Sequence, residues 1–200
     1  REVKRDEWRL TTVERKRILL NNIYGVDIDL QATEVTKLSL QLKVLEGENE
    51  ETILKQLKIS QERALPDLGD NIKCGNSLIG LDFYDRQTTL LDEEEMYRVN
   101  AFDWEREFPD IVSRGGFDAV IGNPPWGAEF TDSELSYLRN INKEIIIRMI
   151  DSFMYFVYLG CGKLRSNGYF GMILPDVILY QKDNEKLRSL LVKNFKVRKI

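Results

Sequence analysis

The sequence predicts an α/β fold with a mostly parallel sheet flanked by helices. Strand-like segments alternate along the chain with segments of helical periodicity, the order that crossover connections between parallel strands produce. Unusual loops directly follow three of the strand-like segments, at Asp27, at Gly75-Asn76 and at Asn123 to Trp126. Because ligands bind beyond the carboxyl ends of parallel strands, we expect all three loops at one edge of the sheet.

Composition favours one packed domain and excludes several kinds of site. Hydrophobic residues make up 42% of the 200 residues and charged residues 31%, which does not indicate disorder. The chain has two distant cysteines and no histidine, which argues against a disulfide framework, a zinc site or a histidine-based triad, and no metal is expected. Two lone thiols fit a reducing compartment, so we expect a cytoplasmic protein, and no apolar run is long enough for a membrane span.

Charge is distributed unevenly along the chain. Residues 139–200 contain 12 basic and 5 acidic residues, a net charge of +7, and residues 1–138 carry a net charge of −11. The basic third could bind a polyanion, or it could be only a solvated lysine-rich surface. Charge alone favours the second interpretation.

The first part of the chain reads as helix, strand, helix and strand. Residues 11–14 match a capping box that opens a helix to about Asn21, and residues 23–28 form a short strand. Residues 31–46 predict a helix, and we expect a short helix at 50–57, a loop at 65–70 and a strand at 71–74. Four apolar side chains carry the helical spacing over 31–46: Val35, Leu38, Leu42 and Leu45.

The second part continues the alternation. Residues 92–112 predict partly helical structure, 117–121 the clearest strand, 148–164 an apolar buried helix and 169–174 another strand. Asp183 is expected to cap a helix to about residue 193, and residues 196–200 to begin a fifth strand. Three apolar side chains of the buried helix are assigned to the core: Phe153, Phe156 and Leu159.

The loop after residues 117–121 has unusual backbone chemistry. Pro124 and Pro125 lack N–H groups and fix φ, and each holds the residue before it in an extended conformation. The Asn123 amide and a backbone carbonyl are then neighbouring hydrogen-bond acceptors, and Trp126 adds a flat apolar surface. Two acceptors that bind both hydrogens of an aromatic amine can turn its lone pair toward an electrophile, without a strong base. The alternative is a rigid turn with a structural tryptophan.

Four motifs, in this order and spacing, resemble the S-adenosylmethionine-dependent N6-adenine DNA methyltransferases, in particular the large enzymes that carry restriction and methylation on one chain. The motifs are IYGVDID (23–29), CGNSLIG (74–80), FDAVIGNPPW (117–126) and GYFGMILP (168–175). The resemblance covers nearly the whole chain and implies a Rossmann-like methyltransferase fold. It also implies that Asn123, Pro124, Pro125 and Trp126 form the catalytic loop.

The same resemblance implies three cofactor-binding positions. Asp27 would accept from the ribose hydroxyls of S-adenosylmethionine, and Ile28 would lie against its adenine ring. Asn76 stands where the family usually has an aspartate that contacts the adenine amine, so this contact would lack a charge. From the residues alone, Asp27 could instead cap the following helix, which Asp29 does more naturally, and Gly75-Asn76 could be a plain tight turn.

The resemblance further implies that residues 1–200 are part of a methyltransferase catalytic domain, incomplete at both ends. The glycine-rich cofactor loop is expected before Arg1 and a target-recognition domain after Ile200, so we expect the fragment alone to be inactive. The partner is double-stranded DNA with a flipped target adenine, and Trp126 would stack on that base. Tyr180 is a further candidate for the base pocket. The oligomeric state stays open, as do methylation of a protein glutamine or an RNA amine and a non-catalytic nucleotide-binding module.

Overall fold

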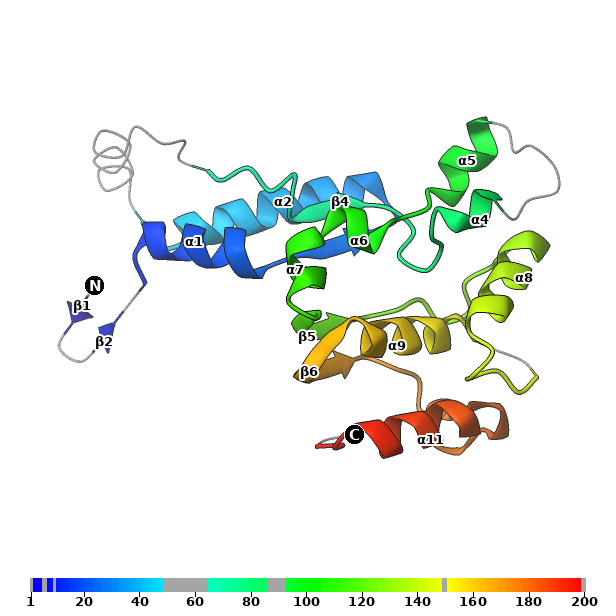
Figure 1. Ribbon diagram of the computed structural model, residues 1–200. Helices are drawn as coiled ribbons and strands as arrows, with labels where there is room; N and C mark the ends of the chain where they lie inside the picture. The colour runs from blue at the N-terminus through cyan, green and yellow to red at the C-terminus, as the bar shows by residue number, and fades with distance from the viewer. Residues whose placement is uncertain are drawn as a thin grey trace. The chain divides into compact units, whose positions relative to one another are not determined.

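The computed structural model describes residues 2–4, 7–8, 10–48, 65–85, 93–148 and 151–198. The chain divides into two compact units, Arg1–Asn76 and Ser77–Ile200, and each is described here by itself (Figure 1). Each unit contains a pair of parallel strands with helices beside it, which confirms the predicted α/β class. Within the described ranges, no helix combines the length and apolar character needed to cross a membrane.

The first unit is built on one parallel strand pair. Its elements are β1 (Glu2–Lys4), β2 (Glu7–Trp8), α1 (Thr12–Asn22), β3 (Gly25–Asp27), α2 (Leu30–Leu45) and β4 (Ile72–Cys74). β1 and β2 form an antiparallel pair that the sequence did not predict, and β3 and β4 pair in parallel. The helices predicted at 11–21 and 31–46 and the strands predicted at 23–28 and 71–74 are confirmed, with β3 shorter than expected, and the expected helix at 50–57 lies outside the described residues. Buried side chains from α1, α2, β4 and the loop before β4 form its core: Leu19, Val44, Leu68 and Ile72.

Two polar side chains fix the ends of α1. Thr11 caps the helix by accepting a hydrogen bond from the Glu14 N–H at 3.3 Å, but the Glu14 carboxylate binds Arg17, so only half of the predicted capping box forms. The buried Asn71 amide donates to the carbonyls of Leu20 at 2.8 Å and Ile23 at 2.9 Å. These bonds tie the end of α1 to the start of β4.

The second unit is built on β5 and β6, which also pair in parallel. Its elements are α4 (Asp82–Asp85), α5 (Glu93–Val99), α6 (Trp104–Glu107), α7 (Pro109–Ser113), β5 (Phe117–Gly122), α8 (Asp132–Ile141), α9 (Ser152–Gly162), β6 (Leu164–Met172), α10 (Val177–Tyr180), the 3-10 helix η1 (Lys182–Asn184) and α11 (Glu185–Asn194). α9 contributes side chains to both hydrophobic clusters of the unit. The predicted core side chains of α9 lie in these clusters, with Phe153 buried and Phe156 and Leu159 partly buried.

Several predicted boundaries in this unit were wrong. α9 begins at Ser152 rather than residue 148, and β6 begins at Leu164 rather than residue 169. Asp183 does not cap a helix, because its carboxylate lies 3.3 Å from Arg148 and α11 begins only at Glu185. Residues 196–198 form no strand, although a strand was expected to begin at residue 196.

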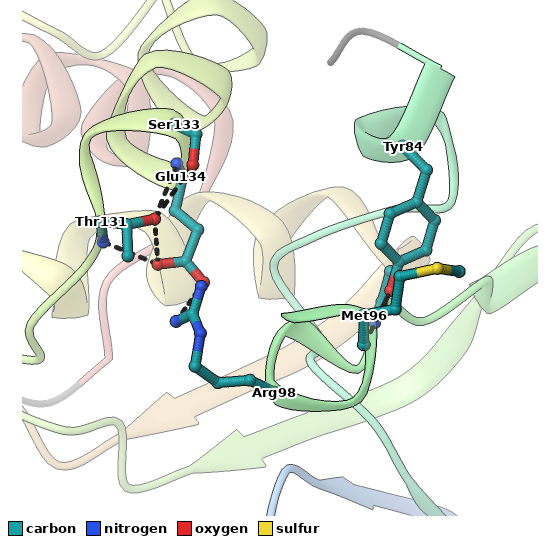
Figure 2. Close-up of polar contacts among 7 residues, drawn as sticks. Tyr84, Met96, Arg98, Thr131, Ser133 and Glu134 are labelled. Atoms are coloured by element: carbon teal, nitrogen blue, oxygen red, sulfur yellow. Dashed lines mark hydrogen bonds and ion pairs between the residues drawn. The ribbon is translucent and has the colours of Figure 1, made fainter. Parts of the chain in front are cut away.

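α8 was not predicted from the sequence, although a complete capping box starts it. Thr131 and Glu134 exchange backbone and side-chain hydrogen bonds, with the Thr131 N–H donating to Glu134 Oε2 at 2.7 Å. Arg98 of α5 donates to the other carboxylate oxygen at 3.3 Å, and Figure 2 shows both partners converging on Glu134. The buried carboxylate of Glu134 is therefore fully paired, which anchors α8 to α5. A separate bond in Figure 2 runs from the Tyr84 hydroxyl of α4, which donates to the Met96 carbonyl of α5 at 3.2 Å.

Two glycines allow α9 and its ends to lie close to the sheet. A Cβ at Gly160 would lie 2.8 Å from the Phe170 ring, so only glycine permits this separation of α9 and β6. At Gly116, just before β5, a Cβ would lie 2.5 Å from the Lys163 carbonyl, and φ is +118°. The close approach of α9 and its C-terminal end to the strands therefore depends on the absence of a side chain at Gly160 and Gly116.

We predict that Gly116→Ala destabilises the second unit by roughly 2–4 kcal/mol, because it adds a backbone clash to an unfavourable φ. Gly115→Ala is the matched control. Its φ is +87° but the space around its Cβ is empty, so it should cost only about 1–2 kcal/mol. Urea unfolding followed by circular dichroism measures both. Equal losses would show that the close approach to Lys163 has no energetic importance.

Candidate active site

The carboxyl end of β3 carries two aspartates with different roles. Asp29 is the N-cap of α2, and its Oδ1 accepts from the N–H of Gln31 at 2.7 Å and of Ala32 at 3.4 Å. Asp27 Oδ1 accepts from the N–H of Asp29 at 2.9 Å. The capping role therefore belongs to Asp29, as the sequence favoured, and the exposed Asp27 carboxylate is held in place by that neighbour.

Asp27, Ile28 and Asn76 gather at one end of the β3–β4 pair. Asp27 lies opposite Cys74, and the N–H of Gly75 donates to the Asp27 carbonyl at 2.8 Å. Because the strands are parallel, Asn76 follows at the same edge as Asp27. Ile28 is 55% exposed there, so it offers an apolar surface beside a carboxylate. Asp27 and Asn76 thus lie at the carboxyl ends of neighbouring parallel strands, as predicted. The binding roles of Asp27, Ile28 and Asn76 stay predictions.

The proline loop continues directly from the end of β5. Its start is fixed, because the Gly122 carbonyl accepts from the N–H of Ile173 at 3.1 Å, beyond the last paired residues of β5 and β6. Pro124 is buried, whereas Asn123 is exposed and Trp126 is 58% exposed. An amide and an indole are therefore presented at the carboxyl end of a strand whose position the sheet determines.

A serine from α9 closes the second half of this loop. Gly127 has φ of +79°, which a glycine adopts without strain, so the backbone turns between Pro125 and Ala128. The Ser152 hydroxyl donates to the Pro125 carbonyl at 2.6 Å and accepts from the Ala128 N–H at 3.1 Å. Trp126 lies inside the turn that Ser152 bridges.

This bridge decides which acceptors of the loop are occupied. The Pro125 carbonyl is occupied, because it accepts a hydrogen bond from Ser152. Among the residues that the structure describes, the Asn123 amide and the Pro124 carbonyl form no hydrogen bond. The sequence predicted an amide and a backbone carbonyl as neighbouring acceptors, and this pair of groups matches that description.

Asp27 and Asn76 belong to the first unit, and residues 123–126 belong to the second. The placement of all three loops at one shared edge therefore stays a prediction. Ser152 was not predicted as part of the site. Its only signal in the sequence is a small polar residue at the start of an apolar helix. That pattern does not indicate which loop the serine contacts.

Other candidates from the sequence have simpler explanations or remain open. Tyr180 ends α10, after β6, and is 67% exposed, so its place in a base pocket stays a prediction. In the basic third of the chain, four cations bind other groups of the same chain: Arg148, Arg165, Lys186 and Arg188. This agrees with a surface role for those four.

The partly buried thiol of α9, Cys161, is not a candidate nucleophile. Burial raises the pKa of Cys161 to about 11, so the thiol stays protonated at neutral pH. Burial lowers the pKa of Lys163, and the negative charges of Glu105 and Asp103 partly offset this by raising it. Neither group lies in the proline loop, which offers acceptors and an aromatic ring rather than a nucleophile.

Comparison with known proteins identifies the family. The Eco57I restriction-modification methylase family matches residues 21–200. The chain belongs to this family. It is 34% identical over 185 residues to the type II restriction enzyme and methyltransferase RM.Eco57I of Escherichia coli, which covers 90% of this chain and 16% of that protein.

A second relative comes from Methanocaldococcus jannaschii and is described as a candidate type II restriction enzyme and methyltransferase. It is 23% identical, and the match covers 81% of this chain and 22% of that protein. The chain thus spans about a sixth to a fifth of the length of these family relatives.

Proposed function

We propose that this chain forms the catalytic part of a DNA methyltransferase that transfers a methyl group to the N6 amine of adenine, within a restriction-modification enzyme. The observation that carries the proposal is the proline loop, held between β5 and the start of α9 in a member of a restriction-modification methylase family. The names of both relatives join restriction with methyl transfer, which supports the assignment of DNA as substrate. A DNA-modifying enzyme of this kind acts in the cytoplasm.

The end of the β3–β4 pair fits S-adenosylmethionine, which supplies an electrophilic methyl group on a sulfonium. Asp27 uses one carboxylate oxygen to accept from the Asp29 N–H, and the other oxygen can accept from a ribose diol. Ile28 offers its exposed side chain to the adenine ring. Asn76, at the same edge, would accept from the adenine amine through its amide oxygen.

The proline loop would prepare the target amine for attack. Asn123 Oδ1 and the Pro124 carbonyl accept the two N6 hydrogens, and this turns the nitrogen lone pair out of conjugation. The new N–C bond forms as the C–S bond breaks, so the bonding electrons leave with sulfur. Asn123 and Pro124 hold the amine while its extra proton passes to water. Catalysis therefore rests on positioning and electrostatics.

Adenine in a duplex reaches this loop only when it leaves the stack. Trp126, 58% exposed, presents a face on which the flipped base can stack. Base–aromatic stacking contributes on the order of 1–3 kcal/mol per base. The loop thus has one part for holding the base and another for its amine.

We predict that Asn123→Ala in the full-length enzyme lowers the rate of methyl transfer about 100-fold, because one preorganised hydrogen bond to the reacting amine is lost. Cofactor affinity should hardly change. Single-turnover methylation of adenine-containing duplex and calorimetry with S-adenosylmethionine measure the two effects. Asn140→Ala, the same change on the exposed face of α8, is the control.

An unchanged rate of methyl transfer would mean that Asn123 is a turn residue only. A loss of cofactor affinity as large as the loss of rate would mean that the loop binds the cofactor and not the target amine. The same assay with a glutamine peptide and with RNA tests the two alternative amine substrates. A full-length protein that methylates none of the three would favour a non-catalytic nucleotide-binding module.

We also predict that substitutions of Asp27 and Asp29, the two aspartates at the carboxyl end of β3, have different effects. Asp27→Ala should weaken S-adenosylmethionine binding about 10- to 100-fold, because a charged acceptor is lost. Asp29→Ala should instead destabilise α2 by about 1 kcal/mol through loss of its N-cap. Calorimetry and thermal unfolding of the full-length enzyme compare them. A cofactor defect confined to Asp29→Ala would reverse our assignment.

A further inference from the structure

We propose that Ser152 is a positioning residue that sets the geometry of the proline loop, an inference that rests on the proposed methyl transfer. Ser152 is the first residue of α9 and only 2% exposed. Its hydroxyl uses both of its functions, as a donor to the Pro125 carbonyl at 2.6 Å and as an acceptor from the Ala128 N–H at 3.1 Å. One side chain therefore holds both ends of a four-residue turn.

In an ordinary β-turn, the carbonyl of the first residue accepts directly from the N–H of the fourth. Here Pro125 and Ala128 are those residues, with Trp126 and Gly127 between them. The φ of +79° at Gly127 is the value that a type II turn has at its third residue. The Ser152 hydroxyl stands between the two groups, so α9 supplies the hydrogen bonds that replace the direct bond of the turn.

The prolines make this external bond important. Pro124 and Pro125 have no N–H, so the loop has few donors of its own between β5 and Ala128. The hydroxyl comes from a rigid support, because the next two residues of α9, Phe153 and Met154, are each 1% exposed. Because these neighbours are fixed in the hydrophobic core, the Ser152 hydroxyl has a fixed position and holds the loop there.

Two consequences for the reaction follow. Ser152 engages the Pro125 carbonyl, which keeps this third acceptor from competing with the Asn123 amide and the Pro124 carbonyl for the amine. It also fixes the turn that carries Trp126, and so the plane on which the target base would stack. Loss of the hydroxyl would free both groups while the cofactor-binding residues of the first unit keep their own hydrogen bonds.

The test compares Ser152→Ala and Ser152→Thr in the full-length enzyme. Ser152→Ala should lower kcat about 10- to 100-fold, as expected for a displaced reacting group, with S-adenosylmethionine affinity unchanged. Ser152→Thr keeps the hydroxyl and should recover most of the rate. Ser113→Ala removes a hydroxyl that donates to the Asp110 carbonyl at 2.9 Å on an exposed helix end, and should leave kcat unchanged.

A second measurement does not depend on activity. Hydrogen exchange of the peptide covering residues 123–130 reports the Ala128 amide, and exchange should be faster in Ser152→Ala than in the wild type or Ser152→Thr. 2-Aminopurine at the target position reports base stacking, and its fluorescence should be less quenched in Ser152→Ala because Trp126 is misplaced.

Unchanged exchange in Ser152→Ala would overturn the bridge itself. Faster exchange with wild-type kcat would reduce Ser152 to a structural residue, as would a lower melting temperature with a normal rate in the folded fraction. A wild-type enzyme that methylates no adenine in DNA but shows the exchange difference would refute the proposed function and leave the bridge intact.

Discussion

The structure around the proline loop depends on one constraint, which is that Pro124 and Pro125 supply no N–H groups where β5 ends. Strand hydrogen bonds last as far as Gly122, whose carbonyl accepts from Ile173. Beyond that point the backbone has carbonyl acceptors but few donors. A loop of this kind is held only if another element provides the missing donor, and Ser152 of α9 does so.

That solution places demands on the rest of the second unit. α9 must lie close enough to the sheet for a short serine side chain to reach the loop. Gly160 permits the approach to Phe170, and Gly116 permits the backbone contact with Lys163 at the other end of the helix. The core side chains of α9 then fix its position, so packing far from the loop determines where one hydroxyl lies.

The sequence predicted those helices, strands and caps that depend on residues close together in the chain. The strand at 117–121 and the helix at 31–46 were found because periodicity and turn residues define them within a few positions. Asp29 as the N-cap was foreseen for the same reason. Asp183 was assigned as a cap on the same rule and was wrong, because Arg148, distant in sequence, binds its carboxylate. The missed α8 had its signal in Thr131 and Glu134, so that omission was not a limit of the sequence.

Ser152 marks the real limit of sequence reasoning. Its partners lie 24 and 27 residues earlier, and no periodicity relates a helix start to a distant turn. The motif identifies the groups that would contact an amine, but not the group that holds them. Residues 123–126 offer hydrogen-bond acceptors and an aromatic ring, so the chemistry of the loop itself is directional hydrogen bonding and stacking. Catalysis of that kind is sensitive to small displacements, so the residue that fixes the loop matters as much as the residues that touch the substrate.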